Sequence, residues 1–262
     1  MGIFHRTKKK ETTQGSFIDG LDLDRGNWFQ VFSACLGKMM AIQTACSELV
    51  VKGQDWNVDF AEGTIRFGNR AYPIQFLGSE STADNTWLWG WENINGFSEE
   101  IIQLAQKTKE KGERFGLKPL TTAEFALDDT CHGHNLSIVT CGLAEKYCYY
   151  RGPHSGGAIF VAFSGVPEEV FAPVDMHKFI SITAQCMQQF PIDHKLFAEG
   201  FLSWNRTEYD WNGHTLTAHF HEDLYMELEQ AGECLRICSM TNRPSGTKSH
   251  GTKDRTESGD RG

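Results

Sequence analysis

Hydrophobic positions recur at steps of three and four between Asn27 and Val51, which predicts one long helix. Gly53 follows as a stop signal. A second helical pattern begins after Ser98, a residue type that caps helices, and ends at Gly116. The first half of the chain therefore predicts two long helices.

Between these helices, short runs of alternating hydrophobic residues predict antiparallel strands. The predicted strands cover residues 56–60, 65–67, 72–77 and 87–91. In the last of them, Trp87, Trp89 and Trp91 occupy alternate positions and share one face. We expect Trp87 and Trp89 to be core residues that face a helix, and Trp91 to border a pocket at the strand end. Gly90 lacks a side chain, so another part of the structure can approach it closely.

The second half of the chain repeats the order of helices and a meander. The pattern at 135–144 fits a strand or a short helix, and we favour the helix. We also expect two strands around the glycine-rich turn 152–157, helices that open at Pro173 and Asp193, and strands at 224–228 and 234–238. Asn212-Gly213 is the strongest short hairpin signal in the chain. The whole pattern predicts an α+β fold, with helices packed on antiparallel meander sheets in two similar subdomains.

Composition suggests four parts. Residues 1–25 and 241–262 are polar and weakly patterned, so we expect a flexible N-terminus and a disordered tail. Residues 26–120 form the predicted helix-meander-helix subdomain, and residues 121–240 form the second α+β subdomain.

Charge and cysteine usage narrow the class of protein. The net charge of −9 argues against nucleic acid as a partner, because phosphate contacts need clustered Lys and Arg. No apolar run approaches the roughly 20 residues that span a bilayer, and the N-terminus lacks the apolar region of a secretory signal. Eight scattered cysteines do not suggest a disulfide scaffold. We expect a cytoplasmic protein with reduced thiols and no membrane partner.

The stretch "LGSESTADNTWLWGWEN", followed later by "YYRGPHSGGAIFVAF", resembles a bacterial family of unknown function. Its members share a Thr-Trp-Leu-Trp-x-Trp-x-Asn strand and a Tyr-Arg-Gly-Pro turn. The resemblance extends over about residues 28–238. It implies a bacterial cytosolic α+β protein and assigns no catalytic residue.

Arg151 stands at the predicted end of a strand, before the glycine-rich turn. A guanidinium next to exposed backbone N–H groups can hold a carboxylate or phosphate. The alternative is an ordinary hairpin whose arginine pairs with an acidic neighbour. We expect a ligand site made of Trp91, Asn93, Arg151 and His154, which binds a small anionic ligand or a protein partner.

Cys131, His132 and His134 are weak candidates for a metal site, because zinc takes nitrogen and sulfur ligands. Their spacing does not match a paired CxxC framework, and His219 and His221 suit the solvated face of a strand. The chain also lacks a nucleotide-binding glycine motif and a nucleophile signature. We therefore expect no metal and no cofactor.

These observations favour a non-enzymatic protein that binds a protein or small ligand in an adaptor, immunity or chaperone-like role. The alternative is a small hydrolase or transferase with a site between the subdomains. That site would use His132, His134 and Arg151. Convergence of these three side chains in one concave pocket would favour the enzyme.

Overall fold

A computed structural model describes residues 16–232 and 234–243 of the chain. Its helices are α1 Trp28–Cys46, α2 Glu99–Phe115, α3 Lys118–Thr121, α4 Gly133–Gly142, α5 Met176–Gln189 and α6 His194–Asn205, with short helical turns at Ser47–Val51, Gly90–Glu92 and Glu168–Phe171. Its strands are β1 Trp56–Asp59, β2 Thr64–Phe67, β3 Arg70–Ser81, β4 Thr86–Trp89, β5 Glu124–Ala126, β6 Cys148–His154, β7 Gly157–Phe163, β8 Tyr209–Asn212, β9 Thr215–His219, β10 Asp223–Ala231 and β11 Cys234–Arg243.

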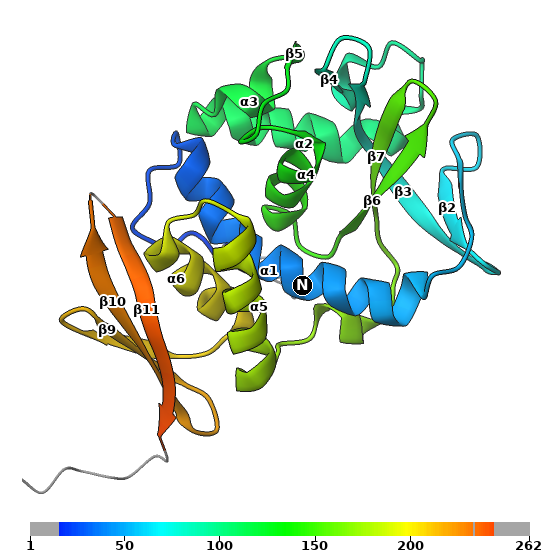
Figure 1. The fold of residues 1–262 in the computed structure, drawn as a ribbon. Helices are drawn as coiled ribbons and strands as arrows, with labels where there is room; N and C mark the ends of the chain where they lie inside the picture. Colours follow the sequence, from blue (N-terminus) through cyan, green and yellow to red (C-terminus); the bar gives the residue numbers. More distant parts are fainter. Residues whose placement is uncertain (1–15, 233, 244–262) are drawn as a thin grey trace, which may run out of the picture.

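Figure 1 shows α1 at the centre of the molecule, between the larger sheet and the group formed by α5, α6 and the smaller sheet. Strands β1 to β7 form the larger sheet, and β8 to β11 form the smaller one. Every strand pair in the described part of the chain is antiparallel. Helices α2 and α4 contact β3, and α6 contacts β11. The predicted α+β fold class is confirmed.

Helix α1 is buried on most sides because α4, α5, α6 and β6 pack against it. Asn27 caps it by accepting a hydrogen bond from the backbone N–H of Gln30 at 3.3 Å. A π-helical turn extends the helix to Val51, so the predicted helix is confirmed. The combined 24 residues are apolar and long enough to cross a membrane, contrary to our expectation, but 56% of the apolar window is buried inside the fold. The core helix of a globular protein can be equally long and apolar.

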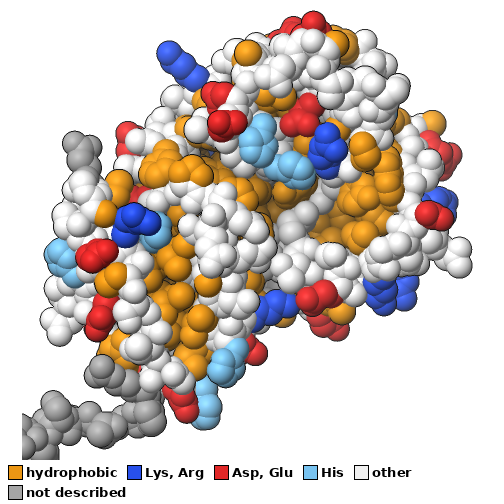
Figure 2. Space-filling model, viewed as in Figure 1, with side chains coloured by type: hydrophobic (Ala, Val, Ile, Leu, Met, Phe, Trp, Pro, Cys, Tyr) orange, Lys and Arg blue, Asp and Glu red, His pale blue; other side chains and the backbone are white. Residues whose placement is uncertain are grey.

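The larger sheet is strongly curled. Strands β1 and β6 lie at opposite ends of the path β1-β2-β3-β7-β6, yet the rings of Trp56 and Tyr150 lie 5.3 Å apart. The face that carries these two side chains is therefore concave. Figure 2 shows a hollow lined by hydrophobic side chains in this part of the molecule.

The tryptophans of β4 support the predicted core. Trp87 and Trp89 are 0% and 1% exposed, and their rings contact each other edge to face at 5.3 Å. The indole N–H of Trp89 donates a hydrogen bond to the carbonyl of Pro119 at 2.9 Å. Both residues are therefore core residues, as predicted.

Trp91 does not share their strand face, so that part of the prediction was wrong. Strand β4 ends at Trp89, and Gly90–Glu92 forms a 3₁₀ turn. Gly90 allows the turn because a Cβ there would lie 2.6 Å from the carbonyl oxygen of Phe76. The chain leaves the sheet at this close approach, and Trp91 becomes half-buried, with the Lys109 ammonium 4.0 Å from its ring centroid.

Strand pairing crosses the predicted boundary between residues 120 and 121. Strands β5, β6 and β7 come after that boundary, yet β5 pairs with β4 and β7 pairs with β3. Hydrogen bonding groups the strands as 56–163 and 209–243 instead. Strand pairing alone does not define folding units, so the division into subdomains stays a prediction.

Both predicted terminal segments differ from expectation where the structure describes them. Ile18 is 1% exposed, and the carbonyl of Phe17 accepts a hydrogen bond from the Ser203 hydroxyl at 2.7 Å, so residues 16–25 pack on the fold. Residues 241–243 continue β11. The weak hydrophobic pattern of these short stretches concealed both features. The rest of the predicted flexible ends, 1–15 and 244–262, lies outside the described residues.

The smaller sheet carries a histidine between two carboxylates. His219 contacts Asp223 through Nδ1 at 2.9 Å and Asp210 through Nε2 at 2.8 Å. It therefore links β9 to both neighbouring strands. These hydrogen bonds, first to Asp223 and then to Asp210, raise the pKa of His219 above its ordinary value of 6.5. His221 lies beyond the end of β9, so the two histidines do not share a strand face as predicted.

We expect His219→Gln to lower the melting temperature most below pH 6.5. Folding raises the pKa of His219, so its contribution to stability is fully present below the pKa of the unfolded chain. This contribution to stability declines as the pH rises through the pKa of the folded protein. Thermal unfolding of both proteins at about pH 6 and about pH 8.5 should show the difference shrinking. His221→Gln, a matched histidine loss outside the strand, should show no such trend. A difference that grows with pH would contradict the assignment.

Candidate functional site

The exposed side of α2 carries a row of cations. Lys107, Lys111 and Arg114 follow one another at steps of four and three, so they lie along one face of the helix. The adjoining side packs on β3, where the Gln75 side chain accepts a hydrogen bond from the backbone N–H of Leu104 at 2.8 Å. Lys107 and Arg114 are exposed on this face, whereas Lys111 is half-buried.

Two cavities lie along this face. We call them together the α2 groove, lined by residues of 16–26, 103–115 and 140–147. The first has a volume of about 400 Å³ and the second about 450 Å³. Lys111, Arg114 and Leu143 line both, so the cavities are neighbours. Their volumes fall within the range of small-molecule sites, roughly 300–1,000 Å³.

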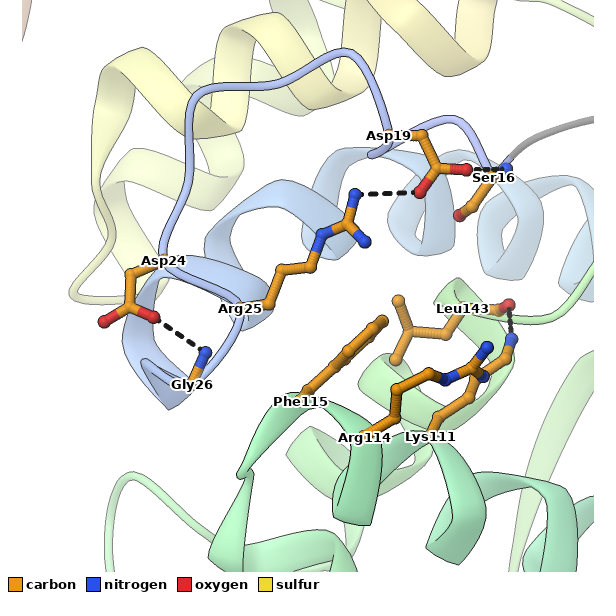
Figure 3. Close-up of a pocket in the computed structure, with 9 residues that line it drawn as sticks. All are labelled: Ser16, Asp19, Asp24, Arg25, Gly26, Lys111, Arg114, Phe115 and Leu143. Carbon is orange, nitrogen blue, oxygen red and sulfur yellow. Dashed lines mark hydrogen bonds and ion pairs between the residues drawn. The ribbon is translucent and has the colours of Figure 1, made fainter.

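Figure 3 shows the first cavity between the loop before α1 and the end of α2. The Arg25 guanidinium binds the Asp19 carboxylate at 2.9 Å and lies 5.4 Å from the centroid of the Phe115 ring. Arg114 lies 5.8 Å from the same centroid and forms no ion pair with any described residue. The Arg114 guanidinium is thus free to bind an anion in this cavity.

The second cavity combines cations with hydrogen-bonding groups. Thr140 lines it, is 1% exposed, and has a buried hydroxyl oxygen without a hydrogen-bond partner in the described part of the chain. Tyr147 lines it too, and burial, followed by the nearby Cys141, raises the pKa of its phenol, which therefore stays protonated. Glu110 and Glu145 contribute carboxylates. An unpaired buried hydroxyl is costly unless a partner is supplied.

Two lysines stabilise the end of α4 that forms one wall of the groove. Lys38, the charged residue of α1, donates hydrogen bonds to the carbonyls of Gly142 at 2.8 Å and Ala144 at 2.6 Å. Lys111 donates to the carbonyl of Leu143. Cations are favourable at the negative end of a helix, where carbonyls lack partners within the helix. Burial lowers the pKa of Lys38 to about 8, and burial followed by Arg114 lowers the pKa of Lys111.

The opposite end of α4 carries a second polar cluster. The backbone N–H of Gly133 donates to a Glu80 carboxylate oxygen at 2.8 Å, and the other oxygen lies 3.6 Å from Nε of Arg151. His134 Nδ1 lies 3.3 Å from the Tyr149 hydroxyl. Burial, followed by the charge of His132, lowers the pKa of His134, so its ring is neutral at pH 7. Figure 2 shows histidine side chains beside a basic side chain on this face of the molecule.

The four predicted ligand residues do not form one cluster of contacts in the described part of the chain, although Arg151 and His154 both lie in β6. Asn93 holds its own loop, because its amide donates to the Phe97 carbonyl at 2.9 Å and its oxygen accepts from the Phe97 N–H at 2.8 Å. His154 accepts from the Gly156 N–H at 3.1 Å in the hairpin turn. Arg151 lies within β6 rather than at its end, and it has an acidic neighbour. No hydrogen bond, ion pair or ring contact among the described residues joins Trp91 to Arg151.

The weak metal candidates are adjacent but do not converge on one point. Burial raises the pKa of Cys131 to about 12, which keeps the thiol protonated. The rings of His132 and His134 lie 6.1 Å apart. In the described part of the chain, no group of three His, Cys, Asp or Glu side chains is placed to hold a metal ion.

Comparison with known proteins places the chain in a family. A model of a family of unknown function, DUF6882, matches residues 30–166. The chain belongs to this family. No curated protein and no solved structure matches it. The DUF6882 match ends well before residue 238, where the sequence resemblance was expected to end.

The DUF6882 region contains α2, α4 and every residue that lines the second cavity. The loop at 16–26, which closes the first cavity, precedes the matched region. Sequence reasoning missed the groove. The spacing of Lys107, Lys111 and Arg114 is visible in the sequence and could have indicated a row of cations. The other segments that line the groove come from distant parts of the chain.

Proposed function

We propose that this member of DUF6882 is a non-enzymatic protein that binds a small anionic ligand in the α2 groove. The observation that carries the proposal is Arg114, which lines both cavities and has no carboxylate partner among the described residues. Lys107 and Lys111 flank it on the same helix face. An arginine fork with neighbouring ammonium groups suits carboxylate or phosphate.

A binding role fits the groove better than catalysis. The residues that line the two cavities include neither histidine nor cysteine, the usual general bases and nucleophiles near neutral pH. We further propose a bacterial, cytoplasmic protein in an adaptor, immunity or chaperone-like role. The eight free cysteines and the acidic net charge support a reducing compartment and partners other than nucleic acid or membrane.

The second candidate is a hydrolase or transferase at the cluster of Glu80, His134 and Arg151. The observation that favours it is the shared carboxylate of Glu80, which brings Arg151 close to the N-terminal end of α4 and its neutral histidine. A neutral imidazole can accept a proton at pH 7.

We expect inorganic phosphate to shift the backbone amide resonances of residues 107–115 and 140–147 in the ¹⁵N-labelled full-length protein, because these residues border the cations. Arg114→Gln should abolish the shifts. Lys118→Gln, which removes an equal charge at the start of α3 outside both cavities, should leave them unchanged.

The same titration separates the two candidates. Shifts centred on Gly133 that disappear in Arg151→Gln would favour the cluster at the other end of α4. A titration without shifts at either end of α4 would remove the support for anion binding.

A further inference from the structure

The second cavity contains groups that an anion alone would leave unused. Besides Lys107, Lys111 and Arg114, it is lined by Glu145, Thr140 and Tyr147. The Thr140 hydroxyl is buried, but the Glu145 carboxylate is exposed and accepts hydrogen bonds, and the phenol of Tyr147 can both donate and accept. A ligand that binds Glu145 and Tyr147 as well as the cations needs neutral hydrogen-bond donors and acceptors in addition to its negative charge.

The carboxylates of the second cavity limit where the negative charge of the ligand can lie. The side chains of Glu110 and Glu145 form no ion pair or hydrogen bond with described residues, so both remain able to accept hydrogen bonds. They would repel a second anionic group on the ligand, because like charges a few ångströms apart disfavour each other. Hydroxyl groups, in contrast, donate readily to carboxylates.

The aromatic side chains of the groove argue against a nucleotide base. Phe115 lines the first cavity, but Arg25 and Arg114 already lie against its ring, with guanidinium carbons 5.4 Å and 5.8 Å from the centroid. Base recognition usually needs a free aromatic face for stacking. The second cavity offers Tyr147 as its one aromatic residue among those that line it.

We propose that the α2 groove binds a sugar phosphate, an inference that rests on the proposed function. The phosphate group would lie against Lys107, Lys111 and Arg114, and the sugar hydroxyls would bind Glu145 and Tyr147. A phosphate is held by arginine and lysine through charge-assisted hydrogen bonds. The cavity of about 450 Å³ is large enough for one such ligand.

Isothermal titration calorimetry of the full-length protein at constant ionic strength tests the ligand class. The probes are glucose 6-phosphate, glucose and inorganic phosphate. We expect glucose 6-phosphate to bind with a Kd at least about tenfold lower than either fragment, because it engages both walls of the cavity. Arg114→Gln should abolish binding of glucose 6-phosphate and of inorganic phosphate, whereas Lys118→Gln should leave both Kd values unchanged.

A further variant isolates the wall that would bind the sugar hydroxyls. Tyr147→Phe removes a single hydroxyl from a half-buried side chain, so the fold should be kept, as circular dichroism would show. It should raise the Kd of glucose 6-phosphate by about three- to tenfold, as expected for one lost hydrogen bond, and leave the Kd of inorganic phosphate unchanged.

The outcomes distinguish the ligand class from the proposed function. Equal affinity for glucose 6-phosphate and inorganic phosphate would overturn the sugar assignment and leave anion binding intact. Binding of glucose as tightly as glucose 6-phosphate would overturn the role of the three cations. A protein that binds none of the probes would overturn both proposals.

Discussion

Replacing Trp89 with alanine is expected to lower the free energy of unfolding by about 3–5 kcal/mol. The side chain is 1% exposed, contacts Trp87 edge to face, and donates a hydrogen bond to Pro119. Its removal would leave a cavity that the surrounding atoms cannot fill and a carbonyl without its donor. Urea unfolding followed by circular dichroism measures the change.

Arg151→Ala is the contrasting variant. Its guanidinium is about a third exposed, and the contact with Glu80 is long, at 3.6 Å. Partly exposed ion pairs contribute about 0–1 kcal/mol, so we expect a small loss of stability. The reverse order, with Trp89→Ala folding normally and Arg151→Ala unfolded, would make Arg151 a structural cation and the tryptophans a candidate binding surface.

Lys38→Met is expected to lower the free energy of unfolding by about 2–5 kcal/mol. The ammonium of Lys38 donates to two carbonyls at the end of α4, and methionine cannot replace either hydrogen bond. Each buried acceptor left without a donor costs about 1–3 kcal/mol. Lys178→Met, at an exposed pair with Glu48, should change stability by less than about 1 kcal/mol. Equal stability of wild type and Lys38→Met would show that these carbonyls do not depend on Lys38.

The pH dependence of the same variant provides an independent check. The pKa of Lys38 falls from 10.5 to about 8 on folding, so the unfolded chain binds more protons than the folded protein between these values. The free energy of unfolding of the wild type should therefore rise relative to Lys38→Met as pH increases from about 8 to about 10. A falling difference over this range would contradict the assigned direction.

The hydrophobic pattern was sufficient to predict most elements. The helix from Asn27 to Val51, the helix after Ser98 and the hairpin at Asn212-Gly213 all occur in the structure. Helix and strand periodicities are local, and each hydrophobic position reports the side of the element that will be buried. The same reasoning identified Trp87 and Trp89 as core residues.

Local patterns did not predict where an element leaves its sheet. Strand alternation placed Trp91 with the other two tryptophans, but the backbone of β3 lies so close to Gly90 that the chain turns there. That contact joins residues distant in sequence, so no window around Trp91 contains it. The buried Ile18 was missed for a related reason, because its few hydrophobic neighbours form no periodic pattern.

The sequence by itself determined the elements, the antiparallel α+β class and the two buried tryptophans, since these depend on local hydrophobic periodicity. Only the tertiary structure decided which polar groups meet. It bound the Asn93 side chain to its own loop, joined Arg151 to Glu80, and brought α2 beside the end of α4. The physical reason is that a binding site is made by side chains from elements far apart in the chain. Their meeting depends on how the helices and sheets pack, which the spacing of residues along the chain does not specify.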